Sequence, residues 1–157
     1  MINMFKITIL AIGSIKEKYL AEAINGYLLR LAPYGKIKIE ELKAEKFSEH
    51  SREQAKRLEA ERIENYLAKR EAARVIVMDE RGKTPDSLAF SKLINEESAE
   101  LIMVIGGALG LADTIKQKYK EQIALSALTM THEMARLILV EQIYRGVTIA
   151  SGKTYHY

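Results

Sequence analysis

The sequence predicts an α/β protein in which helices cover both faces of a parallel sheet. Short apolar segments rich in β-branched residues alternate along the chain with segments whose apolar residues recur at helical spacing. This alternation is typical of parallel sheets, because neighbouring parallel strands are joined by a crossover, usually a helix. A chain of 157 residues with 48% hydrophobic and 29% charged residues fits one globular domain that buries a substantial core.

The first two predicted strands differ in their expected burial. Residues 4–12 (MFKITILAI) form a continuous apolar run and predict a buried strand. The segment 16–35 follows with apolar residues at helical spacing, and its proline and glycine near the end stop this helix. Residues 36–42 (KIKIEEL) alternate apolar and charged side chains, which indicates a strand with one wet face near an edge of the sheet.

The middle of the chain predicts a helix, a strand and a second helix. After a polar loop, a helix dense in Glu, Lys and Arg is expected over 51–72, with a capping box formed by Ser51 and Gln54. Its mixed charges indicate a solvated face. Residues 74–80 (RVIVMDE) predict a buried strand, and a helix capped by Thr84 is expected over 86–97.

The C-terminal third contains the most distinctive segments. Residues 100–110 (ELIMVIGGALG) predict a buried strand that runs into a glycine-rich turn. A helix is expected over 113–121, a short strand over 122–128, and a last helix within 131–146 (THEMARLILVEQIYRG). This last helix is apolar nearly all round, so another surface should bury it.

Composition excludes several classes of function. The chain has no cysteine, which rules out disulfides, thiolate zinc sites and a cysteine nucleophile. Its three histidines lie far apart in sequence, so we expect no metal site. The N-terminus lacks the basic start of a signal peptide, and no apolar run approaches the roughly 20 residues of a membrane span. We therefore expect a cytoplasmic protein with no membrane association, and its net charge of +3 permits RNA as a partner without requiring it.

Three loops are candidates for ligand binding, because ligands in such sheets bind beyond the carboxyl ends of the strands. These loops follow Met78, contain Gly106 and Gly107, and span 125–130 (LSALTM). The glycine pair has two interpretations: a tight turn that needs positive φ, or a backbone that a ligand approaches closely. The sequence contains neither the dinucleotide-binding motif G-x-G-x-x-G nor the phosphate-binding loop G-x-x-x-x-G-K-[ST].

Polar residues at both ends of the last helix are candidates for substrate handling. His132 lies in its first turn, and Arg136 is four residues further along the same face. Each has a simpler interpretation: His132 as a rim or capping residue, and Arg136 as the partner of Glu133. Arg145 has a similar alternative as the i,i+4 partner of Glu141.

Taken together, these segments resemble one bacterial family. VIGGALG followed by ALSALTMTHEMARLILVEQIYRGVTIASGKTYHY is similar to the C-terminal signature of the ribosomal RNA large subunit methyltransferase H family, a group of knotted SPOUT-class enzymes. ITILAIGSIKEKYLAEAINGYLLRLAPYGKIKIEEL resembles that family's opening, so the resemblance covers essentially the whole chain. One departure is Thr131, where the family usually has proline, and threonine can cap the helix instead.

The resemblance implies a single SPOUT domain over 1–157, with a C-terminal trefoil knot that periodicity does not show. It also implies S-adenosylmethionine as methyl donor, methylation of N3 of a pseudouridine in large-subunit ribosomal RNA on assembled ribosomes, and a homodimer with sites near the subunit interface. The implied cofactor-binding residues are Met78, Gly106, Leu125, Ser126, Ala127, Leu128, Thr129 and Met130.

The best candidates for substrate handling are His132, Arg136, Tyr155 and His156. Either histidine is a candidate acceptor of the N3 proton. Tyr155 is expected to stack on the base, and the arginines to hold phosphate. Two alternatives stay open: a non-catalytic RNA-binding or ribosome-assembly protein on the same fold, and a SPOUT enzyme that acts on another RNA nucleotide.

Overall fold

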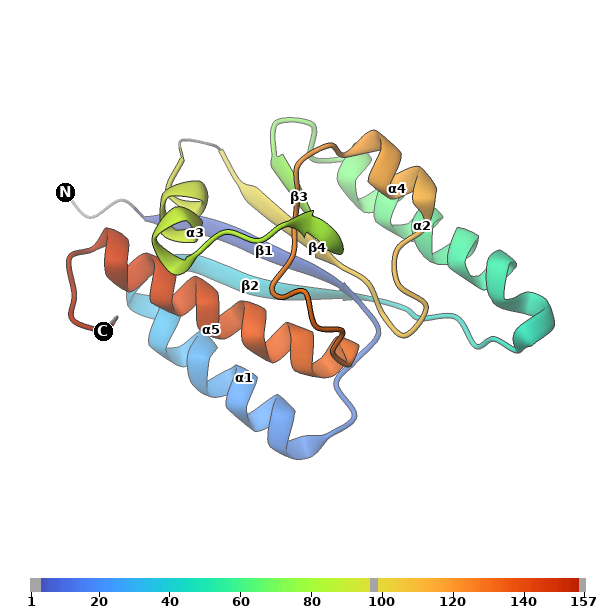
Figure 1. The fold of residues 1–157 in the computed structure, drawn as a ribbon, viewed down its shortest axis with the longest axis horizontal. Coiled ribbons are helices and arrows are strands. Elements are labelled where there is room, and N and C mark those ends of the chain that lie inside the picture. Colours follow the sequence, from blue (N-terminus) through green and yellow to red (C-terminus); the bar gives the residue numbers. More distant parts are fainter. Residues whose placement is uncertain (1–3, 97–98, 156–157) are drawn as a thin grey trace.

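A five-stranded parallel sheet forms the centre of the molecule (Figure 1). The computed structural model describes residues 4–96 and 99–155. The spatial order of the strands is β2-β1-β4-β3-β5, and all four neighbouring pairs are parallel. The strands are β1 (Phe5–Ile12), β2 (Gly35–Leu42), β3 (Arg74–Lys83), β4 (Leu101–Ile105) and β5 (Gln122–Ile123).

Helices cover both faces of this sheet, as the sequence predicts. They are α1 (Lys18–Leu31), α2 (Arg52–Ala68), α3 (Ser87–Ile94), α4 (Asp113–Lys118) and α5 (His132–Ala150), with 3₁₀ turns at Ala32–Tyr34 and Glu49–Ser51. Helices α1, α3 and α5 pack on one face, and α2 and α4 pack on the other. None of the helices in the described residues combines the length and hydropathy needed to cross a bilayer.

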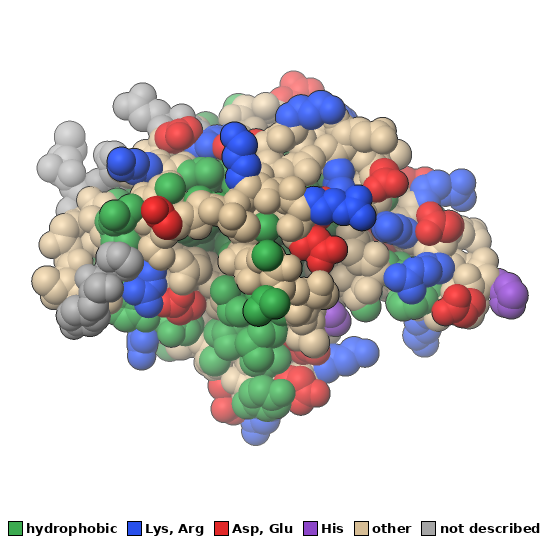
Figure 2. Space-filling model, in the orientation of Figure 1, with side chains coloured by type: hydrophobic (Ala, Val, Ile, Leu, Met, Phe, Trp, Pro, Cys, Tyr) green, Lys and Arg blue, Asp and Glu red, His purple; other side chains and the backbone are tan. Residues whose placement is uncertain are grey.

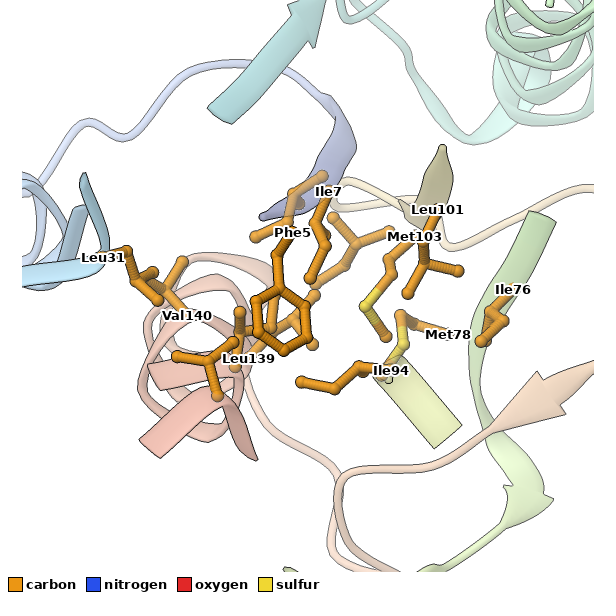
Figure 3. Packing of buried hydrophobic residues seen from close by; sticks show 14 of the residues in the cluster. Phe5, Ile7, Leu31, Ile76, Met78, Ile94, Leu101, Met103, Leu139 and Val140 are labelled. Atoms are coloured by element: carbon orange, nitrogen blue, oxygen red, sulfur yellow. The ribbon is translucent and has the colours of Figure 1, made fainter. Parts of the chain in front are cut away.

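The core consists of two layers, one on each side of the sheet. Successive side chains of a strand point to opposite faces. Ile7 and Ile9 of β1 therefore join the layer under α1, α3 and α5, whereas Leu10 joins the layer under α2 and α4. Figure 3 shows Phe5 and Ile7 packed near Leu139 of α5. Burying such side chains is worth about 1.5–3 kcal/mol each.

The position of β2 confirms the predicted edge strand. It pairs with β1 alone, from Gly35 opposite Phe5 to Leu42 opposite Ile12. Lys36 and Lys38 are exposed between half-buried isoleucines, which is the pattern expected for a strand with one wet face.

Several element boundaries differ from the sequence-based expectations. Strand β5 has two residues instead of seven, because the chain leaves the sheet after Ile123 and forms a loop. Helix α2 ends at Ala68, where Arg70 N donates to the Leu67 carbonyl in a turn. Helix α5 continues to Ala150. The trefoil knot stays a prediction, since strand order and pairing do not define how the chain threads its loops.

Two predicted helix caps are also wrong. Ser48 and Ser51 form a reciprocal capping box at the 3₁₀ turn before α2, so Ser51 does not cap together with Gln54. At α3 the cap is the Asp86 carboxylate, which accepts a hydrogen bond from Ala89 N at 2.8 Å, rather than Thr84. The Asp86 carboxylate satisfies a free N–H group of the first turn of α3, whereas the serine pair serves the 3₁₀ turn and no side chain caps α2 itself.

Candidate functional site

A cleft of about 890 Å³ opens where β3 and β4 meet their carboxyl-end loops. Met78 and Ile105 form its inner wall, and both are buried. The loop after β4 and the N-terminal turn of α5 form its other sides. This is the predicted place for a ligand in a parallel α/β sheet, and the volume lies within the range of about 300–1,000 Å³ typical of small-molecule sites.

The three candidate loops converge on this cleft and on a smaller cavity of about 140 Å³ beside it. Met78, Thr129 and Met130 line both spaces. Gly106 lines only the cleft, whereas Leu125, Ser126 and Leu128 line only the smaller cavity. Of the eight residues that the resemblance assigns to the cofactor, Ala127 alone lines neither space and is exposed.

The turn interpretation is wrong for the glycine pair itself, because among the described residues of this turn the positive φ lies at Gly110 and not at Gly106 or Gly107. The close approach of a ligand to the pair stays a prediction. Gly110 N donates to the Gly107 carbonyl at 3.0 Å, and Gly110 has a φ of 72°, which favours glycine. Gly106 serves close approach instead, because a Cβ there would lie 2.9 Å from the Gly110 carbonyl carbon. Because Gly106 has no side chain, the Gly110 backbone packs directly against it. Gly106 also lines the cleft.

The loop over 125–130 offers free backbone groups to a ligand. Within the described part of the chain, no backbone–backbone hydrogen bond joins these six residues to the rest of the protein. Side chains fix the loop instead: Ser126 Oγ accepts from Leu128 N at 3.0 Å, and Thr129 Oγ1 donates to Glu80 at 3.1 Å. Unpaired backbone N–H and C=O groups beside a cavity can hydrogen-bond the edge of a heterocycle.

An ion pair in the cleft wall was not anticipated from the sequence. Lys116 Nζ of α4 lies 3.2 Å from Asp79 Oδ2 within β3, which continues to Lys83 beyond the predicted end at residue 80, and the Asp79 side chain is only 7% exposed. Both residues line the cleft, as does Glu80. The available signal was the change from apolar to acidic side chains at Asp79 and Glu80 within the run 74–80.

The N-terminus of α5 places His132 on the rim of the cleft. Thr131 Oγ1 accepts from Met134 N at 3.2 Å, which confirms threonine as a cap in the position where proline is usual. The next residue, Glu133, accepts from the backbone N–H groups of Lys16 and Glu17 at 2.5 and 3.1 Å. These hydrogen bonds stabilise the carboxylate and lower the pKa of Glu133.

Arg136 lies elsewhere than predicted. It is 2% exposed, its Nη1 forms an ion pair with Glu41 at the end of β2, and its Nη2 donates to the Gly13 carbonyl at 3.0 Å. The predicted alternative partner, Glu133, is occupied by the β1–α1 loop. Both Nη atoms are therefore engaged within the protein, whereas the buried Nε has no hydrogen-bond partner.

Tyr155 lies towards the other end of α5. Its hydroxyl donates to Glu141 at 3.3 Å, and its ring packs edge-on against Tyr144 with centroids 4.7 Å apart. Burial, with the neighbouring Tyr27 and Glu141, raises the pKa of Tyr155 to about 12. Arg145 pairs with Glu141 at 2.8 Å, as the i,i+4 alternative predicts.

The predicted substrate-handling residues are therefore not brought together within one chain. Glu141 and Tyr144, which Tyr155 contacts, lie about 14 and 18 Å along the axis of α5 from His132, at 1.5 Å per residue. His156 lies outside the described residues.

Comparison with known proteins identifies the family. A family model described as "Predicted SPOUT methyltransferase" matches residues 5–156. Ribosomal RNA large subunit methyltransferase H of Enterococcus faecalis is 40% identical, with 96% of this chain and 99% of the relative covered. The protein of the same name from Syntrophotalea carbinolica is also 40% identical, with 96% and 98% covered.

Solved structures agree on the fold. A methylase family protein from Haemophilus influenzae superposes with a TM-score of 0.61 at 12% identity, covering 98% of this chain and 71% of that one. The SpoU methyltransferase AviRb from Streptomyces viridochromogenes, solved with AdoMet, gives a TM-score of 0.50 at 10% identity, covering 96% and 59%. The chain belongs to the SPOUT methyltransferase family, among the proteins named ribosomal RNA large subunit methyltransferase H.

Proposed function

We propose that this protein uses S-adenosylmethionine to methylate N3 of a pseudouridine in large-subunit ribosomal RNA, on assembled ribosomes in the cytoplasm. Membership of the family makes it a methyltransferase. The observation that carries the proposal is the convergence of three loops, distant in sequence, on one cleft that has His132 at its rim.

The residues present fit this cofactor. Buried apolar side chains such as Met78, Leu109 and Leu111 line the cleft, and the unpaired backbone of 125–130 supplies donors and acceptors. Gly106 borders the cleft, and its lack of a Cβ lets the Gly110 backbone pack against it. We assign cofactor binding to Met78, Gly106, Leu125, Ser126, Leu128, Thr129 and Met130, with Ala127 as a backbone contributor within the same loop. S-adenosylmethionine supplies an electrophilic methyl group bound to a positively charged sulfur.

The protein's own contribution is positioning and proton handling. The cap at Thr131 and the two bonds to Glu133 fix the first turn of α5, so His132 is held on a rigid element. N3 of pseudouridine carries a proton that must leave when the nitrogen is methylated, and we assign its acceptance to His132. A general base of this kind contributes about 10²–10⁴-fold to the rate.

A homodimer accounts for the distance between His132 and Tyr155. Hydrophobic side chains gather on the surface over α1 and α5 (Figure 2). Tyr19 and Leu29 of α1 are 64% and 77% exposed, and Met134 of α5 is 38% exposed. Patches of this kind mark protein interfaces. We propose that two copies pair through this surface, which brings the tail of one copy, with Tyr155 and His156, to the cleft of the other.

The test combines cofactor binding and product analysis. We expect the purified protein to bind S-adenosylmethionine but not NAD in calorimetric titrations, and to methylate ribosomes at one pseudouridine mapped by mass spectrometry. His132→Ala and deletion of 155–157 should each lower methylation while cofactor binding persists. His50→Ala is the matched control, because His50 is exposed on the turn before α2 and should leave the rate unchanged.

The outcomes separate the alternatives. Methylation of a ribose or another base would identify a different SPOUT activity. Absence of S-adenosylmethionine binding, with ribosomes present as well as absent, would favour a non-catalytic assembly protein. Methylation of naked ribosomal RNA at the same rate as ribosomes would contradict the assembled ribosome as substrate.

A further inference from the structure

A second cleft of about 590 Å³ lies beside the cleft of about 890 Å³ to which we assign the cofactor. The two clefts share Gly107, Ala108, Leu109 and His132, so the glycine-rich turn and the proposed proton acceptor border both. Its other walls come from the end of β1, the end of β2 and the segment that leads into α2. A group bound here would therefore sit next to the reacting nucleotide.

Glu59 of α2 provides a buried acceptor in the wall of this second cleft. The residue is 4% exposed, and its Oε1 accepts from Glu45 N at 3.0 Å. Its Oε2 has no hydrogen-bond partner. Burial raises the pKa of this carboxyl, against the opposing effects of the Glu45 N–H and of Arg62. A buried acceptor without a donor costs about 1–3 kcal/mol, and a ligand N–H would remove this cost.

The remaining charges of the second cleft favour an anionic ligand. Glu41 is paired with Arg136, and Glu45 is paired with Arg62. Lys16 and Lys43 line the same cleft and have no carboxylate partner among residues 4–96 and 99–155. Both lysines are exposed, so their ammonium groups are free to contact phosphates at the mouth.

An aromatic ring completes the set of contacts. Phe47 lines the second cleft, and its side chain is 43% exposed, so its ring is open to a ligand. The Arg52 guanidinium lies 5.8 Å from its ring centroid. An exposed ring with a neighbouring arginine is a platform on which single-stranded RNA bases stack.

We propose that the second cleft binds the base of a single-stranded RNA nucleotide next to the methylated one. Glu59 accepts an N–H of that base, and Phe47 stacks against its face. Lys16 and Lys43 contact the flanking phosphates. Every nucleobase carries an N–H donor and a π face, so this subsite holds the strand in place more than it reads the sequence. The inference rests on the proposed function, because it takes ribosomal RNA as the substrate.

The test measures ribosome binding without turnover. Dissociation constants are determined with S-adenosylhomocysteine present, which has no methyl group to transfer, for Glu59→Gln, Lys43→Gln and Phe47→Leu. Glutamine keeps the acceptor for Glu45 N and places an amide NH₂ at the Oε2 position. We expect each change to weaken binding about 3- to 10-fold, in line with the loss of one stacking, phosphate or base-edge contact. Lys92→Gln, on α3 of the opposite face, is the control and should bind within twofold of wild type.

Wild-type dissociation constants for all three variants would overturn the subsite. If Glu59→Gln does not fold, Lys43→Gln and Phe47→Leu still decide, since both side chains are exposed. Ultraviolet crosslinking of the complex should join the segment around Phe47 to a ribosomal RNA base, and a crosslink to ribosomal protein alone would overturn the RNA assignment. The variants could weaken ribosome binding as expected while the wild-type protein does not form the N3-methylated pseudouridine. That result would contradict the proposed function and support the subsite.

Discussion

Arg136 on α5 and Glu41 at the end of β2 form an ion pair that ties the helix carrying His132 to the edge of the sheet. The arginine is 2% exposed, whereas the Glu41 side chain is 45% exposed. Arg136 also donates to the Gly13 carbonyl, so it links α5 to the loop after β1 as well. We interpret Arg136 as a positioning residue that sets the place of His132 at the cleft.

Replacement of Arg136 by methionine should therefore destabilise the protein. The change leaves the Gly13 carbonyl without its donor and removes a buried charge from its pair, which costs about 2–4 kcal/mol. Thermal unfolding should shift downward by about 5–15 °C. Glu41→Gln should also destabilise the protein, because it leaves the buried guanidinium without its counter-charge. Lys38→Gln, which removes an exposed pair with Glu40, is the control, with an expected cost below about 1 kcal/mol. Unchanged stability with lost methylation would instead support a direct contact between Arg136 and RNA.

Gly106→Ala should weaken cofactor binding. The added Cβ would lie 2.9 Å from the Gly110 backbone, so the glycine-rich turn must shift away from its place at the cleft. We expect the dissociation constant for S-adenosylmethionine to rise at least about tenfold, the effect of losing about 1.4 kcal/mol, measured by calorimetry. Gly26→Ala in α1 is the matched control: its Cβ meets no atom within 4 Å, and it should stabilise the helix by up to about 1 kcal/mol. Normal affinity of Gly106→Ala would refute the role of the turn.

Substitutions of Thr131 compare two ways of stabilising the N-terminus of α5, a side-chain cap and a proline. Thr131→Ala removes the cap on Met134 N and should cost about 1 kcal/mol in urea denaturation. Thr131→Pro also loses the cap, but the local φ of −61° and ψ of 150° suit proline. Proline lowers the entropy of the unfolded chain by about 0.4–1 kcal/mol, so this variant should fall between Thr131→Ala and wild type. A proline variant less stable than the alanine variant would contradict this.

Tyr155 should titrate well above the ordinary range of a phenol, because burial and its contacts with Tyr27 and Glu141 raise its pKa. Its folded-state pKa of about 12 lies above the unfolded value near 10, so its contribution to stability is complete below about pH 10 and is lost between pH 10 and 12. Absorbance titration of phenolate should show a late step that Tyr155→Phe lacks. Stability of the wild type should also fall more steeply over this interval than that of Tyr155→Phe. Identical curves for the two proteins would show that Tyr155 is not held as described.

Local patterns in the sequence were sufficient for much of the fold and for the location of the candidate cleft. The alternation of residues 36–42 predicted an edge strand, and β2 is at the edge. The run 100–110 predicted a buried strand that ends in a turn, and β4 ends directly before Gly106. These features follow from periodicity and turn chemistry, which act over a few residues. The loops that line the cleft were predictable for the same reason, since the ends of parallel strands meet at one edge.

The partners of individual side chains were not predictable in this way. Periodicity indicates which face of a helix is buried, but not which distant segment covers it. Arg136 was expected to pair with Glu133 or to face RNA, and its partner comes from β2. Glu133 binds the start of α1, and Tyr155 lies away from His132 along α5. Such pairings depend on how whole elements pack in three dimensions, so residue spacing along the chain predicted the place of the site while packing set which polar groups remain free to act there.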